Sequence, residues 1–320
     1  MRRVAAIDCG TNSIRLLIAD VDVSTGELVD IERRMEIVRL GQGVDRTREF
    51  AAEALDRTLG ACREFARLIR ASRSERVRFV ATSATRDARN RNDFIEGVRA
   101  ALGVDPEVLS GNEEAALSFA GATHELVAGA DASRIERPPF LVVDIGGGST
   151  EFVLGGEGAA HTDSPPQPSA VSVDIGCVRL TERYLADDPP DVAQVAAAQE
   201  EVDAAIRVAE AHVPLAAAQT VVGLAGSVTT VAAMALRLPR YDPARIHHSR
   251  IAADQVHEVA HQLLTMPRSQ RAGLPFMHPG RVDVIGAGAL ILSRVVDASG
   301  ASSLLVSEHD ILDGIAFSIA

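Results

Sequence analysis

A strand–turn–strand pattern occurs twice in this chain, and this repeat restricts the fold more than any other feature. Residues 4–20, VAAIDCGTNSIRLLIAD, and residues 140–156, FLVVDIGGGSTEFVLGG, each contain an apolar run, an aspartate, glycine and hydroxyl residues, and a second apolar run. The equivalent residues lie 136 positions apart: Asp8 and Asp144, Gly10 and Gly146, Ser13 and Ser149. Apolar runs on both sides of glycine predict two strands joined by a tight turn. The repeat therefore predicts a duplicated α/β fold whose two turns face one cleft.

The second turn has the composition of a phosphate-binding site. Its three glycines carry no side chain, so backbone N–H groups can converge on an anion: Gly146, Gly147 and Gly148. Ser149 and Thr150 add hydroxyl donors, and Asp144 at the strand end can hold Mg²⁺ beside that anion. A glycine-rich hairpin without a ligand is the alternative, and the repeated layout favours the functional interpretation.

At the next polar position the two halves differ, with Arg15 in the first and Glu151 in the second. If the two turns face one cleft, the cation on one wall suits phosphate binding, and the carboxylate on the other suits binding of a metal ion or a water molecule.

Composition narrows the class of protein. With 320 residues the chain is long enough for two domains, and no apolar run reaches membrane-spanning length. The N-terminus does not have the pattern of a signal peptide, and the three cysteines are scattered, so we expect a cytoplasmic protein with reduced thiols. A net charge of −12, 3% aromatic residues and no Trp disfavour a nucleic-acid partner.

The chain contains no lysine, so all 32 cationic side chains are arginine. This excludes a Walker A lysine and a Schiff-base lysine. Phosphate recognition is still available, because the planar guanidinium fork of arginine binds phosphate well.

Six motifs occur in the order AAIDCGTNSIRLL, ATSATRDARN, LSGNEEA, VVDIGGGSTEFVLG, DIGCVRLTE and GLAGSVTT. These motifs resemble those of the exopolyphosphatase/guanosine pentaphosphate phosphohydrolase (Ppx/GppA) family. The resemblance extends from Val4 to about Ile315. The resemblance implies two actin-like domains of the actin/Hsp70/sugar-kinase fold with an interdomain cleft. It also implies a Mg²⁺-dependent hydrolase of terminal phosphoanhydride bonds, which releases orthophosphate from inorganic polyphosphate.

Two adjacent glutamates open a predicted helix. Ser110 and Glu113 fit the capping box, which occupies Glu113 at the helix start. Glu114 is not required by that cap; it is either a carboxylate favoured by the helix dipole or a functional group. The resemblance implies that Glu114 is the base that activates the attacking water.

The remaining site residues follow from the motifs and the resemblance. We assign phosphate binding to Ser13, Arg15, Arg86, Gly146, Gly147, Gly148, Ser149, Thr150, Gly226 and Ser227. For Ser227, ordinary capping of the next helix is the alternative. Mg²⁺ is assigned to Asp144 and Glu151, and whether Glu151 acts as a second catalytic carboxylate or as a metal ligand is left open.

The domain prediction uses the polar, proline-terminated stretch Gly129–Pro139 as a linker. It gives an N-terminal domain over 1–128 and a C-terminal domain over 140–320.

The histidines are given no metal role. His247 and His248 have no partner at metal-ligand spacing, and the run His257-Glu258-Val259-Ala260-His261 matches a zinc motif but is better explained as a surface helix.

Several functions stay open at this point. The chain ends where longer family members continue into helical domains, and its net charge repels a long polyanion, so we expect a preference for short polyphosphate. Guanosine pentaphosphate is the second substrate candidate. A sugar or acid kinase of the same fold and a polyphosphate- or nucleotide-binding protein with weak activity are the alternatives from other classes, and a homodimer is kept open as an assembly.

Overall fold

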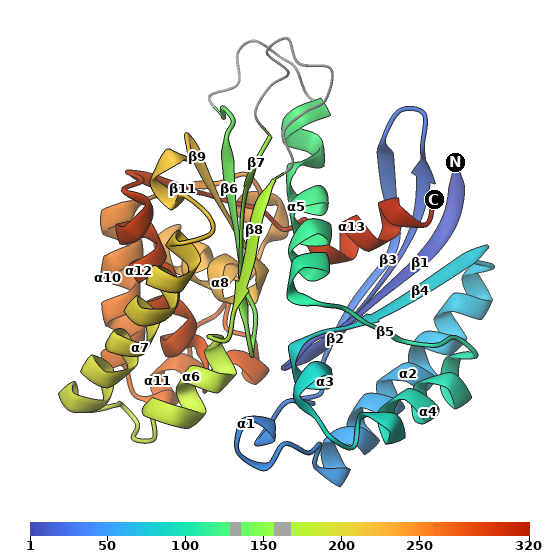
Figure 1. The fold of residues 1–320 in the computed structure, drawn as a ribbon, viewed down its shortest axis with the longest axis horizontal. Helices are drawn as coiled ribbons and strands as arrows, with labels where there is room; N and C mark the ends of the chain where they lie inside the picture. Colours follow the sequence, from blue (N-terminus) through green and yellow to red (C-terminus); the bar gives the residue numbers. More distant parts are fainter. Residues whose placement is uncertain (129–135, 157–167) are drawn as a thin grey trace. The chain divides into compact units, whose positions relative to one another are not determined.

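The computed structural model describes residues 1–128, 136–156 and 168–320. These form two compact units: Met1–His124 together with Ile311–Ala320, and Glu125–Asp310. Each unit is built on one mixed β-sheet with helices packed against it, so the predicted α/β class is confirmed (Figure 1). Among the described residues, no helix combines the length and the apolar character needed to cross a membrane.

The first unit contains a five-stranded sheet. Across the sheet the strands are β3 (Glu27–Ile37), β2 (Ser13–Asp22), β1 (Arg2–Cys9), β4 (Arg76–Ala81) and β5 (Glu107–Val108). Val4–Cys9 of β1 are all buried, and successive side chains point to opposite faces of the sheet. Ala5 and Ile7 therefore enter one core cluster, and Val4 and Ala6 enter another on the opposite face.

Helices pack against both faces of this sheet. They are α1 (Val44–Thr47), α2 (Ala52–Ser72), α3 (Ser83–Asp87), α4 (Arg91–Leu102), α5 (Gly111–Ala128, in this unit up to His124) and α13 (Ile311–Ser318). α2 and α4 contribute Phe65 and Phe94 to one core cluster, whereas α13 contributes Leu312 and Ile315 to the other (Figure 1). The buried residues of α2 recur every three or four positions, as expected for an amphipathic helix.

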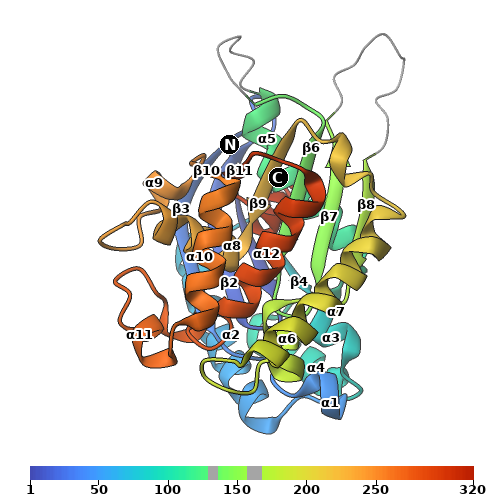
Figure 2. The same ribbon diagram turned by 90° about the vertical axis from the view of Figure 1, so that its left-hand side faces the viewer.

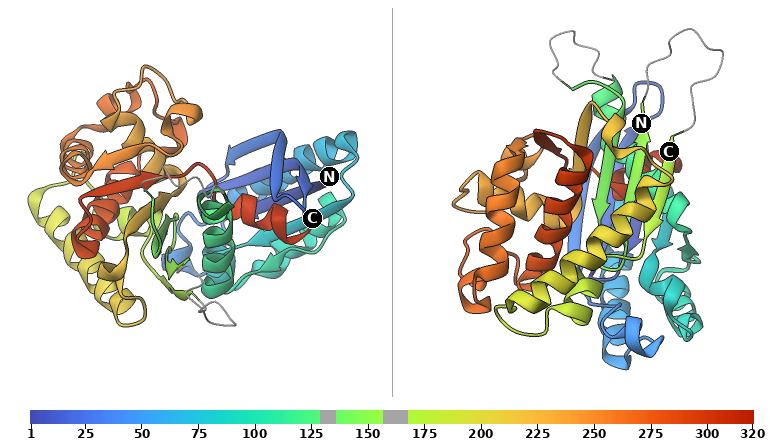
Figure 3. Two further views of the ribbon diagram at one scale, coloured as in Figure 1. Left: turned by 90° about the horizontal axis from the view of Figure 1, so that it is seen from above. Right: turned by 60° about the vertical axis from the view of Figure 1, so that its left-hand side comes forward.

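The second unit contains a six-stranded sheet. Across the sheet the strands are β10 (Arg250–Ala252), β11 (Ser303–Val306), β9 (Thr220–Leu224), β6 (Phe140–Ile145), β7 (Thr150–Gly155) and β8 (Ser169–Val173). The helices are α6 (Cys177–Tyr184), α7 (Val192–Glu210), α8 (Ala225–Ala235), α9 (Pro243–Ile246), α10 (Ala253–Thr265), α11 (Arg268–Ala272) and α12 (Ile285–Ser299), with short 3₁₀ turns at Leu215–Ala217 and Pro279–Arg281. Figure 2 shows α10, α12 and α7 side by side, and Figure 3 gives two further views of them.

The two sheets share one connectivity. The order β8-β7-β6-β9-β11 repeats β3-β2-β1-β4-β5. In each sheet the first two strands in sequence form an antiparallel hairpin, and the fourth strand runs parallel to the first. The predicted duplication is therefore confirmed in the topology. That the two turns face one cleft stays a prediction.

The C-terminal helix groups with the first unit, which differs from the predicted domain over 140–320. Its apolar residues share a core cluster with Val4 and Leu17. The helix also approaches α5 closely, since a Cβ at Gly314 would lie 2.0 Å from the carbonyl oxygen of Leu117. Asp313 is 1% exposed and pairs with Arg33 of β3. Of the predicted linker 129–139, residues 129–135 lie outside the described residues.

Candidate active site

The two repeated turns close in the same way. The N–H of Gly10 donates to the carbonyl of Ser13 at 2.9 Å, and the N–H of Gly146 donates to the carbonyl of Ser149 at 3.0 Å. The strand register then places Arg15 directly opposite Asp8 in the first unit. These equivalent bonds give the sequence repeat a structural cause, because each turn needs a glycine and a residue three positions later that closes the loop.

The carbonyl groups of the second turn are held by the start of α6. The N–H groups of Cys177 and Val178 donate to the carbonyls of Gly146 and Gly147 at 3.0 and 2.9 Å. The Nε of Arg179 donates to the carbonyl of Gly148 at 2.8 Å. With its carbonyls held in this way, the turn has a fixed backbone orientation.

The N–H groups of this turn remain available. Within the described parts of the chain, no hydrogen bond is made by the N–H of Gly147, Gly148 or Ser149, nor by the Ser149 hydroxyl. Successive free N–H groups in a turn form a concave anion site. Gly176 makes the arrangement possible, because a Cβ there would lie 2.4 Å from the carbonyl carbon of Gly147.

Two carboxylates lie beside this turn. Asp144 on β6 and Glu151 on β7 are directly opposite each other in the register, so their side chains share one face of the sheet. They are 7% and 1% exposed. The hydroxyl of Ser172 on β8 donates to Oε1 of Glu151 at 2.7 Å. Two neighbouring buried carboxylates disfavour each other's ionised form unless a cation lies between them. Carboxylate and hydroxyl oxygens are the ligands that Mg²⁺ prefers, so this donor set fits the predicted ion.

Among the described residues, the hydroxyl of Thr150, unlike that of Ser149, is used in a hydrogen bond within the protein. Its side chain is fully buried, and its hydroxyl donates to the carbonyl of Ile175 at 2.7 Å. That proton is thus not available to a phosphate.

The first unit contributes a paired arginine and glutamate. Arg86 of α3 donates through NH1 to Oε2 of Glu114, in the first turn of α5, and to the carbonyl of Leu109, each at 2.8 Å. Glu114 is 9% exposed. The pair holds the carboxylate in place, and an anion that binds Arg86 would compete with Glu114 for the guanidinium.

Glu113 forms the predicted capping box. The N–H and the hydroxyl of Ser110 donate to Oε2 of Glu113 at 2.8 and 2.7 Å, and the N–H of Glu113 donates to the Ser110 hydroxyl at 3.3 Å. These bonds lower the pKa of Glu113. Glu113 therefore makes the cap, as the sequence predicts, and Glu114 pairs with Arg86 instead.

Arg15 is held by the aspartate of its own turn. Its Nε and NH2 lie 3.0 and 2.6 Å from Oδ2 of Asp8, which is 4% exposed. Ser13 begins β2 and is half-buried. In the intervening loop, Thr11 and Ser83 join their hydroxyls at 3.0 Å, a contact between β1–β2 and α3 that the sequence does not indicate.

The third turn, at the start of α8, is packed against an arginine that sequence reasoning missed. A Cβ at Gly226 would lie 2.3 Å from Cζ of Arg281, whose NH1 donates to Thr230 at 3.3 Å. The Ser227 hydroxyl lies against Gly288 and interacts with the buried thiol of Cys177, where burial raises the pKa of the thiol and the Ser227 hydrogen bond lowers it. The Ser227 hydroxyl therefore already has neighbours within the protein, at Gly288 and Cys177.

Three further residues contact the turns or the carboxylates beside them, and none of them was assigned to the site from the sequence. Arg179 reaches the second turn, Ser172 reaches Glu151, and Arg281 reaches the third turn, each from a position far along the chain. Only the position of Arg179 in the DIGCVR motif could have pointed to it.

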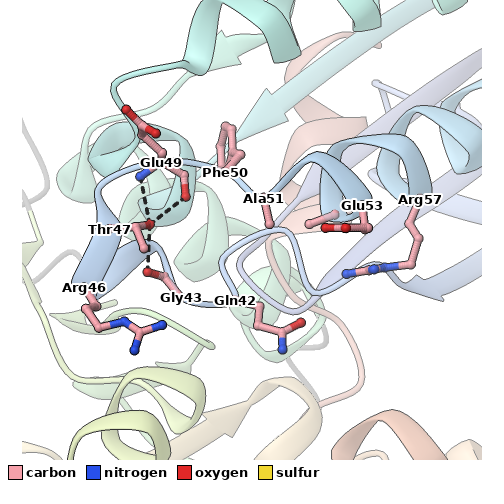
Figure 4. Close-up of a pocket in the computed structure, with 10 residues that line it drawn as sticks. Gln42, Gly43, Arg46, Thr47, Glu49, Phe50, Ala51, Glu53 and Arg57 are labelled. Atoms are coloured by element: carbon pink, nitrogen blue, oxygen red, sulfur yellow. Dashed lines mark hydrogen bonds between the residues drawn. The ribbon is translucent and has the colours of Figure 1, made fainter.

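A separate pocket of about 410 Å³ lies in the first unit (Figure 4). The residues that line it are Gln42, Gly43, Arg46, Thr47, Glu49, Phe50, Ala51, Glu53, Ala54 and Arg57. Two arginines balance two glutamates, and none of the predicted site residues lines this pocket. It therefore has no part in the candidate active site.

The zinc interpretation of the His257–His261 run finds no support. Nδ1 of His257 shares a hydrogen bond with Ser293 at 2.8 Å, and Nε2 lies 3.3 Å from Asp297. In the described residues, no third ligand gathers at this pair.

Comparison with known proteins gives consistent results. Residues 17–320 match the model of the Ppx/GppA phosphatase family. The chain is 49% identical, over 332 aligned positions, to a Mycobacterium tuberculosis protein named exopolyphosphatase 2, covering 100% of this chain and 99% of the relative.

Solved structures agree with this match. One, described as an exopolyphosphatase-like protein, superposes with a TM-score of 0.92 at 42% identity, over 100% of this chain and 98% of the other. A second, a Ppx/GppA enzyme of Aquifex aeolicus, gives a TM-score of 0.77 at 29% identity, over 99% of both chains. The predicted actin-like fold is confirmed by these neighbours together with the repeated sheet order.

Proposed function

Because the chain belongs to the Ppx/GppA phosphatase family, we propose that it is an exopolyphosphatase that releases orthophosphate from the ends of inorganic polyphosphate. The predicted enzyme class, a hydrolase of phosphoanhydride bonds, agrees with this membership. The observation that carries the proposal is the second turn. It presents free N–H groups of Gly147 and Gly148 directly beside the carboxylates of Asp144 and Glu151.

A terminal phosphate suits this turn for electrostatic reasons. Backbone N–H groups that are already oriented stabilise the negative charge of a phosphoryl group without reorganisation during the reaction. Gly176 and Arg179 hold that orientation from behind the turn. Bound Mg²⁺, held by Asp144 and Glu151, would neutralise charge on the phosphate oxygens. The Ser149 hydroxyl adds a donor at the same turn.

Glu114 is our proposed base. Hydrolysis of a phosphoanhydride needs a water oriented for in-line attack, and a carboxylate can position that water and accept its proton. When a phosphate group of the substrate binds Arg86, it competes with Glu114 for the guanidinium, which frees the carboxylate for the water. This role requires both units to act on one substrate, which is part of the proposal.

The length of the substrate, the cofactor and the compartment are also part of the proposal. We propose short polyphosphate as the preferred substrate, because a net charge of −12 repels long polyanions. We also propose Mg²⁺ as the cofactor and the cytoplasm as the compartment. Guanosine pentaphosphate is the second candidate, since its terminal phosphate presents the same chemistry.

One assay separates these functions. Orthophosphate release is measured from short polyphosphate, long polyphosphate, guanosine pentaphosphate and ATP at matched concentrations of chain ends, with Mg²⁺ and with EDTA. We expect the fastest release from short polyphosphate and loss of activity in EDTA. Faster release from long chains would refute the length preference, and faster release from guanosine pentaphosphate would select the second candidate. Binding of polyphosphate without release would indicate a binding protein instead.

A further inference from the structure

Three histidines surround one glutamate in the second unit. Nε2 of His247 lies 3.1 Å from Oε2 of Glu125, and Nε2 of His248 lies 3.9 Å from the same oxygen. Nδ1 of His309 lies 3.6 Å from Oε1 of Glu125. These side chains come from the end of α5, the loop after α9 and the loop after β11, so the fold brings together residues that are far apart in sequence.

We propose that Glu125, His247 and His248 bind a divalent transition-metal ion of the zinc class, with His309 as a fourth side chain at the same ion. The ligand atoms of the first three residues all lie within 4.8 Å of one another. Four ligands placed tetrahedrally at about 2.0–2.2 Å from zinc are about 3.3–3.6 Å apart, so small side-chain rotations close the site.

The donor set defines the class of ion. Imidazole nitrogens with one carboxylate suit zinc, cobalt or nickel, whereas Mg²⁺ prefers oxygen ligands only. The site is therefore chemically different from the oxygen site at Asp144 and Glu151. Glu125 supplies the negative charge: burial raises its pKa, but the hydrogen bond with His247 and the charges of the other histidines lower it overall.

The backbone of His248 is held by its surroundings, and its ring stacks on that of His247. The N–H of His248 donates to the carbonyl of Val306 at 2.7 Å, and His248 has a left-handed φ of 57°, which is uncommon for a residue other than glycine. The rings of His247 and His248 stack with centroids 3.8 Å apart. A non-glycine residue in this conformation persists only where its surroundings hold it there.

His247 must change its proton position when the metal binds. The N–H of Glu308 donates to Nδ1 of His247 at 3.2 Å, so the neutral ring carries its proton on Nε2 and donates it to Glu125. For Nε2 to bind metal, this proton moves to Nδ1 and the Glu308 hydrogen bond is lost. The metal–nitrogen and metal–carboxylate bonds replace these two hydrogen bonds.

The position of the cluster suggests what the ion does. Glu125 is the first residue of the second unit, and His309 precedes its last residue, Asp310. An ion bound to both would join the segment that enters this unit to the segment that leaves it. Binding to the folded state alone stabilises that state in proportion to the logarithm of the metal concentration.

The test uses the full chain without a histidine tag, after chelator treatment. Zn²⁺ binding is measured by titration calorimetry, the environment of the metal by the visible absorption of bound Co²⁺, and the unfolding temperature with and without Zn²⁺. We expect one strong site per chain, a Co²⁺ spectrum typical of tetrahedral coordination and a higher unfolding temperature with Zn²⁺. Mg²⁺ should produce none of these at the same concentration.

Variants locate the site. Glu125→Gln removes the charge but keeps a hydrogen-bond acceptor, and His248→Asn removes the ring while tolerating the left-handed backbone. Each should weaken Zn²⁺ binding by at least about 10–100-fold, the loss found even for residues that only support a metal ligand. The matched control His257→Ala/His261→Ala removes the other close histidine pair and should leave the strong site intact. Loss of binding in the control, or equal binding in all the variants, would overturn the proposal.

Discussion

The proposed base can be tested with two neighbouring substitutions that differ only in position. Glu114→Gln and Glu113→Gln remove the same charge from the first turn of α5. Among the described residues, the side chain of Glu113 forms hydrogen bonds only with Ser110, and a capping box accepts glutamine as well as glutamate. Glu113→Gln therefore keeps the cap, and it loses the negative charge that favours the Ser110 hydrogen bonds and the helix N-terminus, so we expect only a small loss of folding stability.

Glu114→Gln should act mainly on the rate. Removal of a positioned base lowers the rate by about 10²–10⁴-fold, which corresponds to about 3–5 kcal/mol of activation free energy at 1.36 kcal/mol for each tenfold change. The substitution also removes the charge partner of Arg86. That guanidinium keeps the Leu109 carbonyl and can use the amide oxygen of Gln, so we expect a stability loss of about 1–3 kcal/mol.

The assay separates rate from stability. Orthophosphate release is measured at saturating polyphosphate well below the unfolding temperature of each variant, polyphosphate binding is measured independently, and urea unfolding gives the stability. Glu114→Gln should bind substrate and turn it over slowly, and Glu113→Gln should turn it over at nearly the rate of the unmodified protein. If Glu113→Gln lost the activity while Glu114→Gln kept it within about threefold, the assignment of the base by this reasoning would be refuted.

Three further predictions follow from the described contacts. Asp144→Asn should raise the Mg²⁺ concentration needed for half-maximal activity without unfolding the chain, and an unchanged Mg²⁺ titration would count against the metal role. Gly176→Ala places a methyl group against the backbone of Gly147 and should lower the urea-derived stability by about 1–3 kcal/mol, whereas Gly60→Ala, in a spacious position on α2, should raise it slightly. Since the pKa of Glu125 is lowered from 4.5, its contribution to stability is present above that pH and lost as the pH falls through its folded value; a chemical denaturation series against pH should show this in the unmodified protein and not in Glu125→Gln.

Local patterns in the sequence predicted the parts of the fold that local geometry determines. The hairpin repeat was predictable because each turn closes through one hydrogen bond between residues three positions apart, at Gly10 and at Gly146. The helix expected at about 50–71 occurs at Ala52–Ser72, where one apolar stripe fixes its buried face. The partner of the C-terminal helix was not predictable, since an apolar stripe shows that a helix is buried but not against which sheet.

In the candidate site, too, contacts between residues close in sequence could be predicted and contacts between distant residues could not. The capping bonds of Glu113 join residues three apart and could be predicted, whereas the pair of Arg86 and Glu114 joins residues 28 apart. Arg179 reaches Gly148 across 31 positions, and His247 reaches Glu125 across 122. Metal-ligand spacing rules describe ligands on one loop or helix, so they could not find ligands that the tertiary fold assembles.

The difference in charge between Arg15 and Glu151, at equivalent positions of the two repeated turns, bears on where a cation can bind. In the first unit the residue opposite the aspartate is Arg15, which lies 2.6 Å from Asp8 and neutralises it within the protein. In the second unit the opposite residue is Glu151, so the same register places two carboxylates opposite each other. Two carboxylates on one face of a sheet supply oxygen ligands for a divalent ion, whereas an aspartate opposite an arginine does not. The change from Arg15 to Glu151, together with glycines in place of Thr11 and Asn12, therefore favours metal-assisted phosphate chemistry at the second turn.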